Sequence, residues 1–347
     1  MIRPADLAMR MPAEWEPHSR CWMMWPCREA LYGDHLEAAR DAYAEVAKAI
    51  ARFEPVTMVA SSDELVEASL KCGPGVSTLS LEHDDSWMRD AGPTFVRDGT
   101  GRIAGVDWRW NAWGNKYEDY AADALVAANV LAHLDMKRFE APLVMEGGAF
   151  HVDGEGTLIT TEQCLLNPNR NPDLSKSEIE KLLGDYLGVE RIIWLGRGLE
   201  DDDTDGHVDE IACFVRPGVV MALTSSDPTD ANYAALSENV ARLKAASDAK
   251  GRAFEIIEIE QPRRRMLDNG WRMSLSYTNF YIANGGIVMP AFEDPQDTKA
   301  FEVMTKAFSD RQVVQIPALD IVRGGGGIHC ITQQQPAGEA LPASIGE

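Results

Sequence analysis

The sequence predicts an α/β fold in which one module, a strand hairpin with a helix, recurs along the 347 residues and closes into a ring. Three observations predict it. Amphipathic helical segments are spread along the chain, pairs of apolar segments joined by glycine-containing turns lie between them, and these turns return at similar intervals. A repeated interval of this size indicates a repeat architecture, and we expect about five modules. They would form one domain spanning residues 1–347.

The helices are predicted from hydrophobic residues that recur every three or four positions. The clearest stripe runs from Leu36 to Phe53 and is typical of a helix that packs one face against the core. Ser175 and Glu178 have the spacing of a capping box, which predicts a helix start there. Comparable helical segments are expected at 62–72, 117–134, 177–186, 230–246 and 297–308.

Four hairpins are predicted because each pair of apolar segments flanks a turn with glycine or asparagine, residues that accept positive φ. The turn glycines are 55, 64 and 67 residues apart. On spacing alone, an ordinary mixed α/β sheet with coincidental hairpins is the alternative. The turn glycines are Gly99, Gly154, Gly218 and Gly285, and the paired segments are 92–96 with 103–108, 149–152 with 157–161, 210–215 with 219–224, and 279–282 with 287–291.

A fifth, partial copy of the module is expected at residues 324–332. Its partner strand would come from residues 56–60, so that the two ends of the chain close the ring. No linker rich in proline or serine and no low-complexity run marks a domain boundary.

The chain carries 55 acidic and 33 basic residues, a formal net charge of −22. Nucleic-acid binding needs a basic face, so this balance argues against a nucleic-acid partner. It also disfavours binding to an anionic membrane surface. A small cationic substrate suits the sign of the charge.

The cysteines and the start of the chain bear on the compartment. The six cysteines form no CxxC pair, and a chain of this length does not need disulfides to stabilise its core. No segment reaches the roughly 18 consecutive apolar residues of a membrane span, and the first residues lack the apolar core of a signal peptide. We expect a reduced, cytoplasmic protein without a membrane partner, and leave open whether it forms a homo-oligomer.

Polar residues directly precede the first strand of each hairpin. A strand that enters the core would not require polar residues at this position. If the hairpins form a ring, these positions meet at one end of it. Convergent carboxylates, a histidine and a cysteine have the composition of a reaction centre. The residues are Asp90, Glu146, His207, Asp209 and Cys330.

Cys330 follows four glycines, which let a ligand approach closely and favour a nucleophile. Four other cysteines are expected to fill the core as small hydrophobic residues. They are Cys21, Cys72, Cys164 and Cys213.

The other polar positions each have a simpler interpretation. His207 and Asp209 would project from one face if they lie on a strand, because side chains alternate there, but such a pair alone is a weak signal. Asp90 could form a local ion pair with Arg89, and Glu146 could belong to a turn. Most of the acidic run at 200–205 is expected to be a solvated loop.

Several carboxylates around one nucleophile are electrostatically costly unless the substrate is cationic. A guanidinium is planar, always charged and able to meet carboxylates with two hydrogen bonds. The Cys330 thiolate would attack the guanidinium carbon and form an amidino-cysteine. His207 would transfer protons to the leaving nitrogen and from the incoming water.

In these segments the sequence resembles the agmatine deiminases, guanidino-modifying enzymes of the five-bladed α/β-propeller (pentein) fold. The resemblance covers nearly the whole chain and implies hydrolysis of agmatine to N-carbamoylputrescine and ammonia, a step toward putrescine, with no metal or organic cofactor. The segments are MPAEWEPH at 11–18, WMRDAGP at 87–93, EGG at 146–148, TDGHVD at 204–209 and GGGGIHCITQQ at 324–334.

The resemblance also implies roles for individual residues. Cys330 corresponds to the family nucleophile, His207 to its general acid/base and Glu146 to the carboxylate that orients the histidine. Asp90 and Asp209 correspond to the carboxylates that hold the guanidinium.

Other residues bear on the tail of the substrate. Trp87 corresponds to an aromatic residue that lines the pocket and could contact an alkyl chain. The chain departs from the family pattern at Gly327 and at Glu210, where asparagine is usual, and residues 202–205 resemble the bacterial peptidylarginine deiminases. Agmatine, arginine, peptidyl-arginine and other guanidinoalkyl compounds therefore remain as substrates.

Two rival functions follow from the same residues. One is a metal-dependent hydrolase with His207, Asp209, His329 and Cys330 as ligands. The adjacent pair His329 and Cys330 would point to opposite faces of a strand, which disfavours a shared metal site. The other rival is a non-catalytic acidic propeller that binds proteins.

Overall fold

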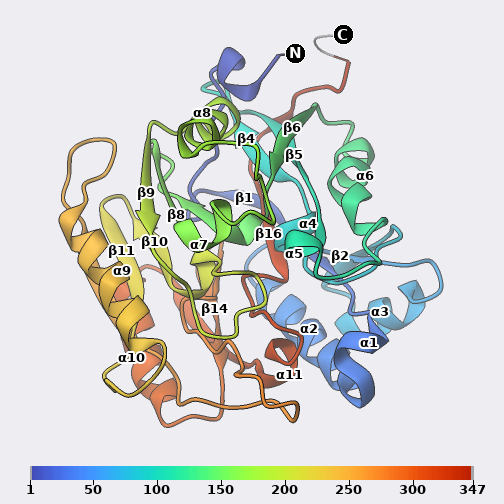
Figure 1. The fold of residues 1–347 in the computed structure, drawn as a ribbon. Helices are drawn as coiled ribbons and strands as arrows, with labels where there is room; N and C mark the ends of the chain where they lie inside the picture. Colours follow the sequence, from blue (N-terminus) through green and yellow to red (C-terminus); the bar gives the residue numbers. More distant parts are fainter. Residues whose placement is uncertain (1, 345–347) are drawn as a thin grey trace.

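The structure is a computed structural model that describes residues 2–344. Within this range the strands form five sheets, and each sheet contains an antiparallel pair followed by a parallel strand. Helices flank the sheets, with α9 and α10 at the left of Figure 1 and α6 at the right. The predicted α/β class is confirmed.

All four predicted hairpins are present, and in each sheet a third strand runs parallel to the second strand of the hairpin. A parallel pair needs a long crossover, which explains the spacing between successive hairpins. The strands are β4 (Thr94–Arg97), β5 (Arg102–Arg109) and β6 (Arg138–Val144); β7 (Phe150–Val152), β8 (Thr157–Thr161) and β9 (Arg191–Leu195); β10 (Ala212–Arg216), β11 (Val219–Thr224) and β12 (Glu255–Glu260); β13 (Tyr281–Ala283), β14 (Gly286–Ala291) and β15 (Gln312–Pro317).

The fifth sheet joins both ends of the chain in the order β16 (Thr332–Pro336), β1 (His18–Met24), β2 (Val56–Ala60) and β3 (Val76–Ser80). The prediction that residues 56–60 pair with the C-terminal copy is wrong, because β1 lies between them, antiparallel to β16 and parallel to β2. The apolar part of β1 is too short to be distinguished from a loop by periodicity. In Figure 1, β1 (blue) and β16 (red) lie side by side near the centre. A short strand, β17 (Glu339–Ala340), pairs with β5.

Most predicted helices are confirmed, and the capping box of Ser175 and Glu178 opens α8 as expected. The helix expected at 117–134 is much shorter, because the chain enters it through a 3₁₀ turn, η3 (Asp123–Leu125). The longer helices are α2 (Leu36–Ile50), α3 (Leu65–Cys72), α6 (Val126–His133), α8 (Lys176–Leu187), α9 (Tyr233–Ala245) and α10 (Gln296–Ala307).

The remaining helical elements are single turns that connect the longer ones. No helix in residues 2–344 has the length and hydropathy that a membrane crossing requires. The turns are η1 (Pro4–Leu7), α1 (Glu29–Tyr32), η2 (Gly33–His35), α4 (Met88–Ala91), α5 (Ala112–Asn115), η4 (Gly147–Ala149), α7 (Glu162–Leu165), η5 (Val208–Glu210) and α11 (Leu319–Val322).

Three of these turns bring the predicted polar residues together. The turns α4, η4 and η5 directly precede the first strands of their hairpins. Contacts join α4 to η4, η4 to η5, and α4 to β16, so the starts of four sheets meet in one place. The convergence predicted from the hairpin pattern is therefore confirmed.

The local structure at two of these positions differs from the prediction. Residues 207–209 are not on a strand, because the Ile211 N–H bonds to the Val208 carbonyl and closes a 3₁₀ turn before the ladder of β10 begins. His329 and Cys330 likewise lie in a turn ahead of β16. The strand geometry assumed for both pairs is wrong.

The cysteine prediction holds. All six thiols are unpaired, and the four that we expected in the core are buried.

Candidate active site

Cys330 lies at the base of a narrow pocket between the turns that precede the sheets. Trp87, Asp90 and Cys330 line this pocket, together with residues 324–326 of the glycine run. A Cβ atom at Gly326 would lie 2.7 Å from the Trp87 ring and 3.1 Å from the Cys330 Sγ. Glycine is required there because the indole and the thiol already occupy the space of a side chain.

The Cys330 thiol is buried among carboxyl groups. Its Sγ lies 3.5 Å from Asp209 Oδ2 and 3.8 Å from Glu210 Oε1. Burial, followed by the negative charges of Asp209 and Glu210, raises the pKa of Cys330 well above its usual value. The free protein therefore holds a neutral thiol, and a cation beside it would favour the reactive thiolate.

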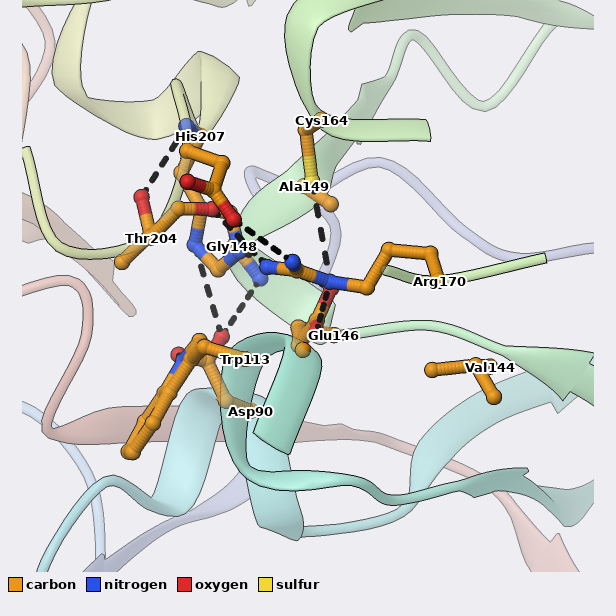
Figure 2. A network of polar contacts seen from close by, with 12 residues as sticks. Asp90, Trp113, Val144, Glu146, Gly148, Ala149, Cys164, Arg170, Thr204 and His207 are labelled. Carbon is orange, nitrogen blue, oxygen red and sulfur yellow. Dashed lines mark hydrogen bonds and ion pairs between the residues drawn. The ribbon is translucent and has the colours of Figure 1, made fainter. Parts of the chain in front are cut away.

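His207 lies between two carboxylates. Its Nε2 is 3.6 Å from Glu146 Oε2 and its Nδ1 is 3.9 Å from Asp90 Oδ1, contacts drawn in Figure 2. Burial would lower the pKa of His207, but the charge of Asp90 and the contacts with Cys164 and Glu146 outweigh it and hold this pKa well above 6.5. Neither ring nitrogen has a hydrogen-bond partner within residues 2–344.

Glu146 is held by an arginine that the sequence did not reveal. Arg170 Nε donates to Glu146 Oε1 at 2.6 Å, and Arg170 Nη1 donates to Asp205 Oδ2 at 2.8 Å. Figure 2 shows the guanidinium reaching across to the Glu146 carboxylate. Burial raises the pKa of Glu146, but the charges of Arg170 and His207 bring it below 4.5. Glu146 is therefore a carboxylate rather than part of a solvated turn.

Asp90 is fixed from two sides. Its Oδ2 accepts from Trp113 Nε1 at 2.9 Å, and its Oδ1 accepts from the Gly148 N–H at 2.9 Å. A Cβ at Gly148 would lie 2.6 Å from His207 Nδ1, so the second glycine of the EGG motif makes room for the imidazole. The local pair with Arg89 is absent among the described contacts, since Arg89 meets Glu14 at 3.2 Å instead.

Asp209 faces both the Cys330 thiol and a buried histidine. His329 Nδ1 donates to Asp209 Oδ2 at 2.8 Å, and His329 Nε2 donates to Glu14 at 2.9 Å. Because both acceptors are carboxylates, His329 is an imidazolium. Burial raises the pKa of Asp209, but the hydrogen bond and charge of His329 lower it below its usual value. Asp209 Oδ1 has no hydrogen-bond partner in residues 2–344.

The acidic run is more structured than predicted. Asp202 is buried and accepts from the Thr204 and Gly206 N–H groups, and Asp205 bonds to Arg170. The prediction that most of this run is a solvated loop is therefore wrong. Asp203 nevertheless remains partly exposed, at the mouth of the pocket. A wider cavity of about 540 Å³ adjoins the pocket and shares Asp203 with it.

The proposed metal ligands do not form one cluster. Within residues 2–344, three groups of His, Cys, Asp or Glu side chains have ligand atoms within 4.8 Å of one another. His207 lies in one group, His329 in another, and Asp209 and Cys330 in the third. This division disfavours the metal hydrolase. His329 and Cys330 do not point to opposite faces as expected, since both contact Asp209. The groups are Glu14, His151 and His329; Glu146, Cys164 and His207; and Asp209, Glu210 and Cys330.

Residues 10–336 match the family described as Porphyromonas-type peptidyl-arginine deiminase. The chain belongs to this family. A Legionella pneumophila protein that is named a putative agmatine deiminase is 52% identical to this chain. The match covers 97% of this chain and 98% of the Legionella protein. The agmatine deiminase of Stutzerimonas stutzeri is 47% identical, with 94% and 95% covered. The solved agmatine deiminase of Enterococcus faecalis has a TM-score of 0.94 at 36% identity, covering 97% and 98% of the two chains.

Proposed function

We propose that this protein hydrolyses agmatine to N-carbamoylputrescine and ammonia through a covalent amidino-cysteine. The observation that carries the proposal is the Asp209 carboxylate. One of its oxygens is 3.5 Å from the Cys330 Sγ, and the other is buried without a partner in the described chain. A guanidinium would supply the missing donor and place its carbon beside the sulfur. Names of close relatives support the same activity.

In the first half-reaction, the positive charge of the substrate lowers the cost of ionising Cys330, whose thiol proton leaves to solvent, and Asp209 and Asp90 hold the guanidinium. The thiolate attacks the guanidinium carbon and forms a C–S bond. His207, an imidazolium in the free protein, donates its proton to the terminal nitrogen, the C–N bond breaks and ammonia leaves. The products of this step are the amidino-cysteine and neutral His207.

In the second half-reaction, neutral His207 accepts a proton from a water molecule, and the resulting hydroxide attacks the amidino carbon. The C–S bond then breaks, the hydroxyl proton of the intermediate passes to the Cys330 sulfur as the C=O forms, the carbamoyl product leaves and the neutral thiol is regenerated. Glu146 keeps the imidazole oriented through both steps, and its own position depends on Arg170. Trp87 forms an apolar wall for the alkyl chain.

The substrate tail decides between agmatine and other guanidines. Asp203 lies on the wall shared by the pocket and the wider cavity, and its carboxylate accepts from the Tyr117 hydroxyl at 2.8 Å. A carboxylate there attracts the terminal amine of agmatine and repels the α-carboxylate of free arginine. Peptidyl-arginine remains the alternative, since the family carries that description.

We also propose that the five sheets are the blades of a single ring-shaped domain over residues 1–347. The shared strand order of the sheets and the sheet built from both chain ends support this arrangement. A cytoplasmic location stays a prediction, and the formation of a homo-oligomer stays an open question.

Ammonia release from agmatine, free arginine and a peptide with an internal arginine tests the function. We expect agmatine to be turned over fastest, and C330A to be inactive while retaining its circular dichroism spectrum. A preference for the peptide would overturn the choice of substrate and leave the deiminase chemistry standing. Wild-type protein that releases ammonia from none of them, or C330A with full turnover, would overturn the chemistry itself.

A further inference from the structure

One side chain that contacts Cys330 has no role in the mechanism above. Asn279 lies just ahead of β13 and is buried. Its Nδ2 donates to the Cys330 Sγ at 3.2 Å and to Glu210 Oε1 at 3.0 Å. Its Oδ1 accepts from the His329 N–H at 2.8 Å and from the Cys330 N–H at 3.4 Å.

These four contacts determine which way the amide points. A carboxamide has two N–H donors and one oxygen with two acceptor sites, and all four are used here. Turning the amide over would place its NH₂ group against two backbone N–H donors. The backbone of the turn at 329–330 therefore requires the oxygen on its side, and the N–H donor must face the Cys330 Sγ.

The side-chain donor to Cys330 matters because the other side chains that hydrogen-bond the sulfur are acceptors. Among the side-chain hydrogen bonds of Sγ in residues 2–344, those to Asp209 and Glu210 can only receive the thiol proton. In the described residues Asn279 is the one side chain that donates to the sulfur, and the Gly327 backbone bonds to it in the same sense. A hydrogen bond to an ionised acceptor is about twice as strong as a neutral one, so this contact favours the thiolate over the thiol.

We propose that Asn279 is the side-chain hydrogen-bond donor that stabilises the Cys330 thiolate and, through the backbone of the turn, holds the sulfur in position. The inference rests on the proposed function only in taking Cys330 as the nucleophile. Asn279 touches the reacting atom, so it acts directly on the thiolate rather than through another residue.

The surroundings of Asn279 differ from the family pattern at two positions. A Cβ at Gly327 would lie 2.5 Å from Asn279 Oδ1, so glycine leaves the space that the amide occupies. Glu210 accepts the second N–H of the amide. Gly327 and Glu210 are the two positions where asparagine is usual in the agmatine deiminases, and both face Asn279. Gly327 therefore leaves room for the amide, and Glu210 accepts one of its hydrogen bonds.

The test follows Cys330 in the absence of substrate. Alkylation by iodoacetamide at fixed pH, read on the Cys330 peptide by mass spectrometry, reports the fraction of thiolate. N279D is the decisive variant, because it keeps the size and the acceptor for the backbone N–H groups but loses the donor to sulfur. We expect its alkylation to be slower by about tenfold or more, and kcat for agmatine to fall more than KM changes.

Two further variants separate this role from a structural one. G327A should displace the amide without removing any hydrogen-bonding group, and should slow alkylation in the same direction. N239A is the matched control. Asn239 is equally buried and also joins two backbone groups, accepting from the Gly196 N–H and donating to the Arg197 carbonyl, both at 2.8 Å. We expect N239A to lower stability without changing the alkylation of Cys330.

Folded N279D that is alkylated at the wild-type rate would overturn the role of Asn279. Equal slowing in N239A would also overturn it, because loss of stability would then explain the effect. If the wild-type protein releases no ammonia from any guanidine, the proposed function fails, while the alkylation comparison still decides whether Asn279 acts on the thiol.

Discussion

Replacing Arg170 by glutamine should destabilise the protein strongly, because this arginine joins two acidic segments in the interior. Its guanidinium donates to Glu146, to Asp205 and, at 2.9 Å, to the Thr204 carbonyl. Removing one partner of a buried ion pair costs about 3–5 kcal/mol, since the other charge is left uncompensated. With an unfolding entropy of about 2.1 cal/mol/K per residue, the loss lowers the Tm by about 4–7 °C.

Thermal unfolding followed by circular dichroism measures this effect, and R242Q is its control. Arg242 also joins two acidic residues, Glu162 and Glu238, but all three side chains are at least one-third exposed. An exposed pair contributes about 1 kcal/mol or less. If R170Q lowers the Tm no more than R242Q does, the ion pair does not support the site in the way described.

The pH dependence of the stability lost in R170Q tests whether the Arg170–Glu146 ion pair stabilises the folded protein. Because Arg170 helps to lower the pKa of Glu146 in the folded state, the pair stabilises the protein at pH values above the unfolded pKa. This stability is lost as the pH falls through the folded pKa. The difference between wild type and R170Q should therefore narrow below pH 4.5, and a constant difference would contradict the assignment.

Three other substitutions test the remaining parts of the site. H207N should lower kcat by about 10²-fold or more if the imidazole transfers protons, and a rate near wild type would exclude that role. G148A places a methyl group 2.6 Å from His207 Nδ1 and should reduce kcat well beyond its effect on Tm; equal activity would show that the imidazole can move aside. D203N should raise the KM for agmatine about fivefold or more and leave kcat nearly unchanged, whereas an unchanged KM would separate Asp203 from the substrate tail.

Much of the site was accessible from the sequence because its residues precede recognisable hairpins. Turn glycines and alternating apolar segments locate the hairpins, and polar residues just before them stand out against a buried strand. This reasoning reached Asp90, Glu146, His207, Asp209 and Cys330. It did not reach the side chains that support them, because these are dispersed and carry no local signal.

The supporting residues illustrate the limit. Arg170 lies in a polar loop that resembles any surface segment, and Glu14 lies in the segment MPAEWEPH, whose sequence indicates no role for this residue. Asn279 looked like the first residue of an ordinary strand. A contact across 51 residues, such as that between Asn279 and the Cys330 Sγ, depends on how two sheets pack and not on any spacing in the chain.

The sequence by itself determined the α/β class, the hairpins, the helices that separate them and the chemical character of the site, because hydrophobic periodicity and turn residues act over short distances. Only the tertiary structure decided that β1 separates β2 from β16, that residues 207–209 form a 3₁₀ turn, and which partners set the charge of each site residue. Burial and ionic neighbours control protonation, and both arise only when distant segments pack together.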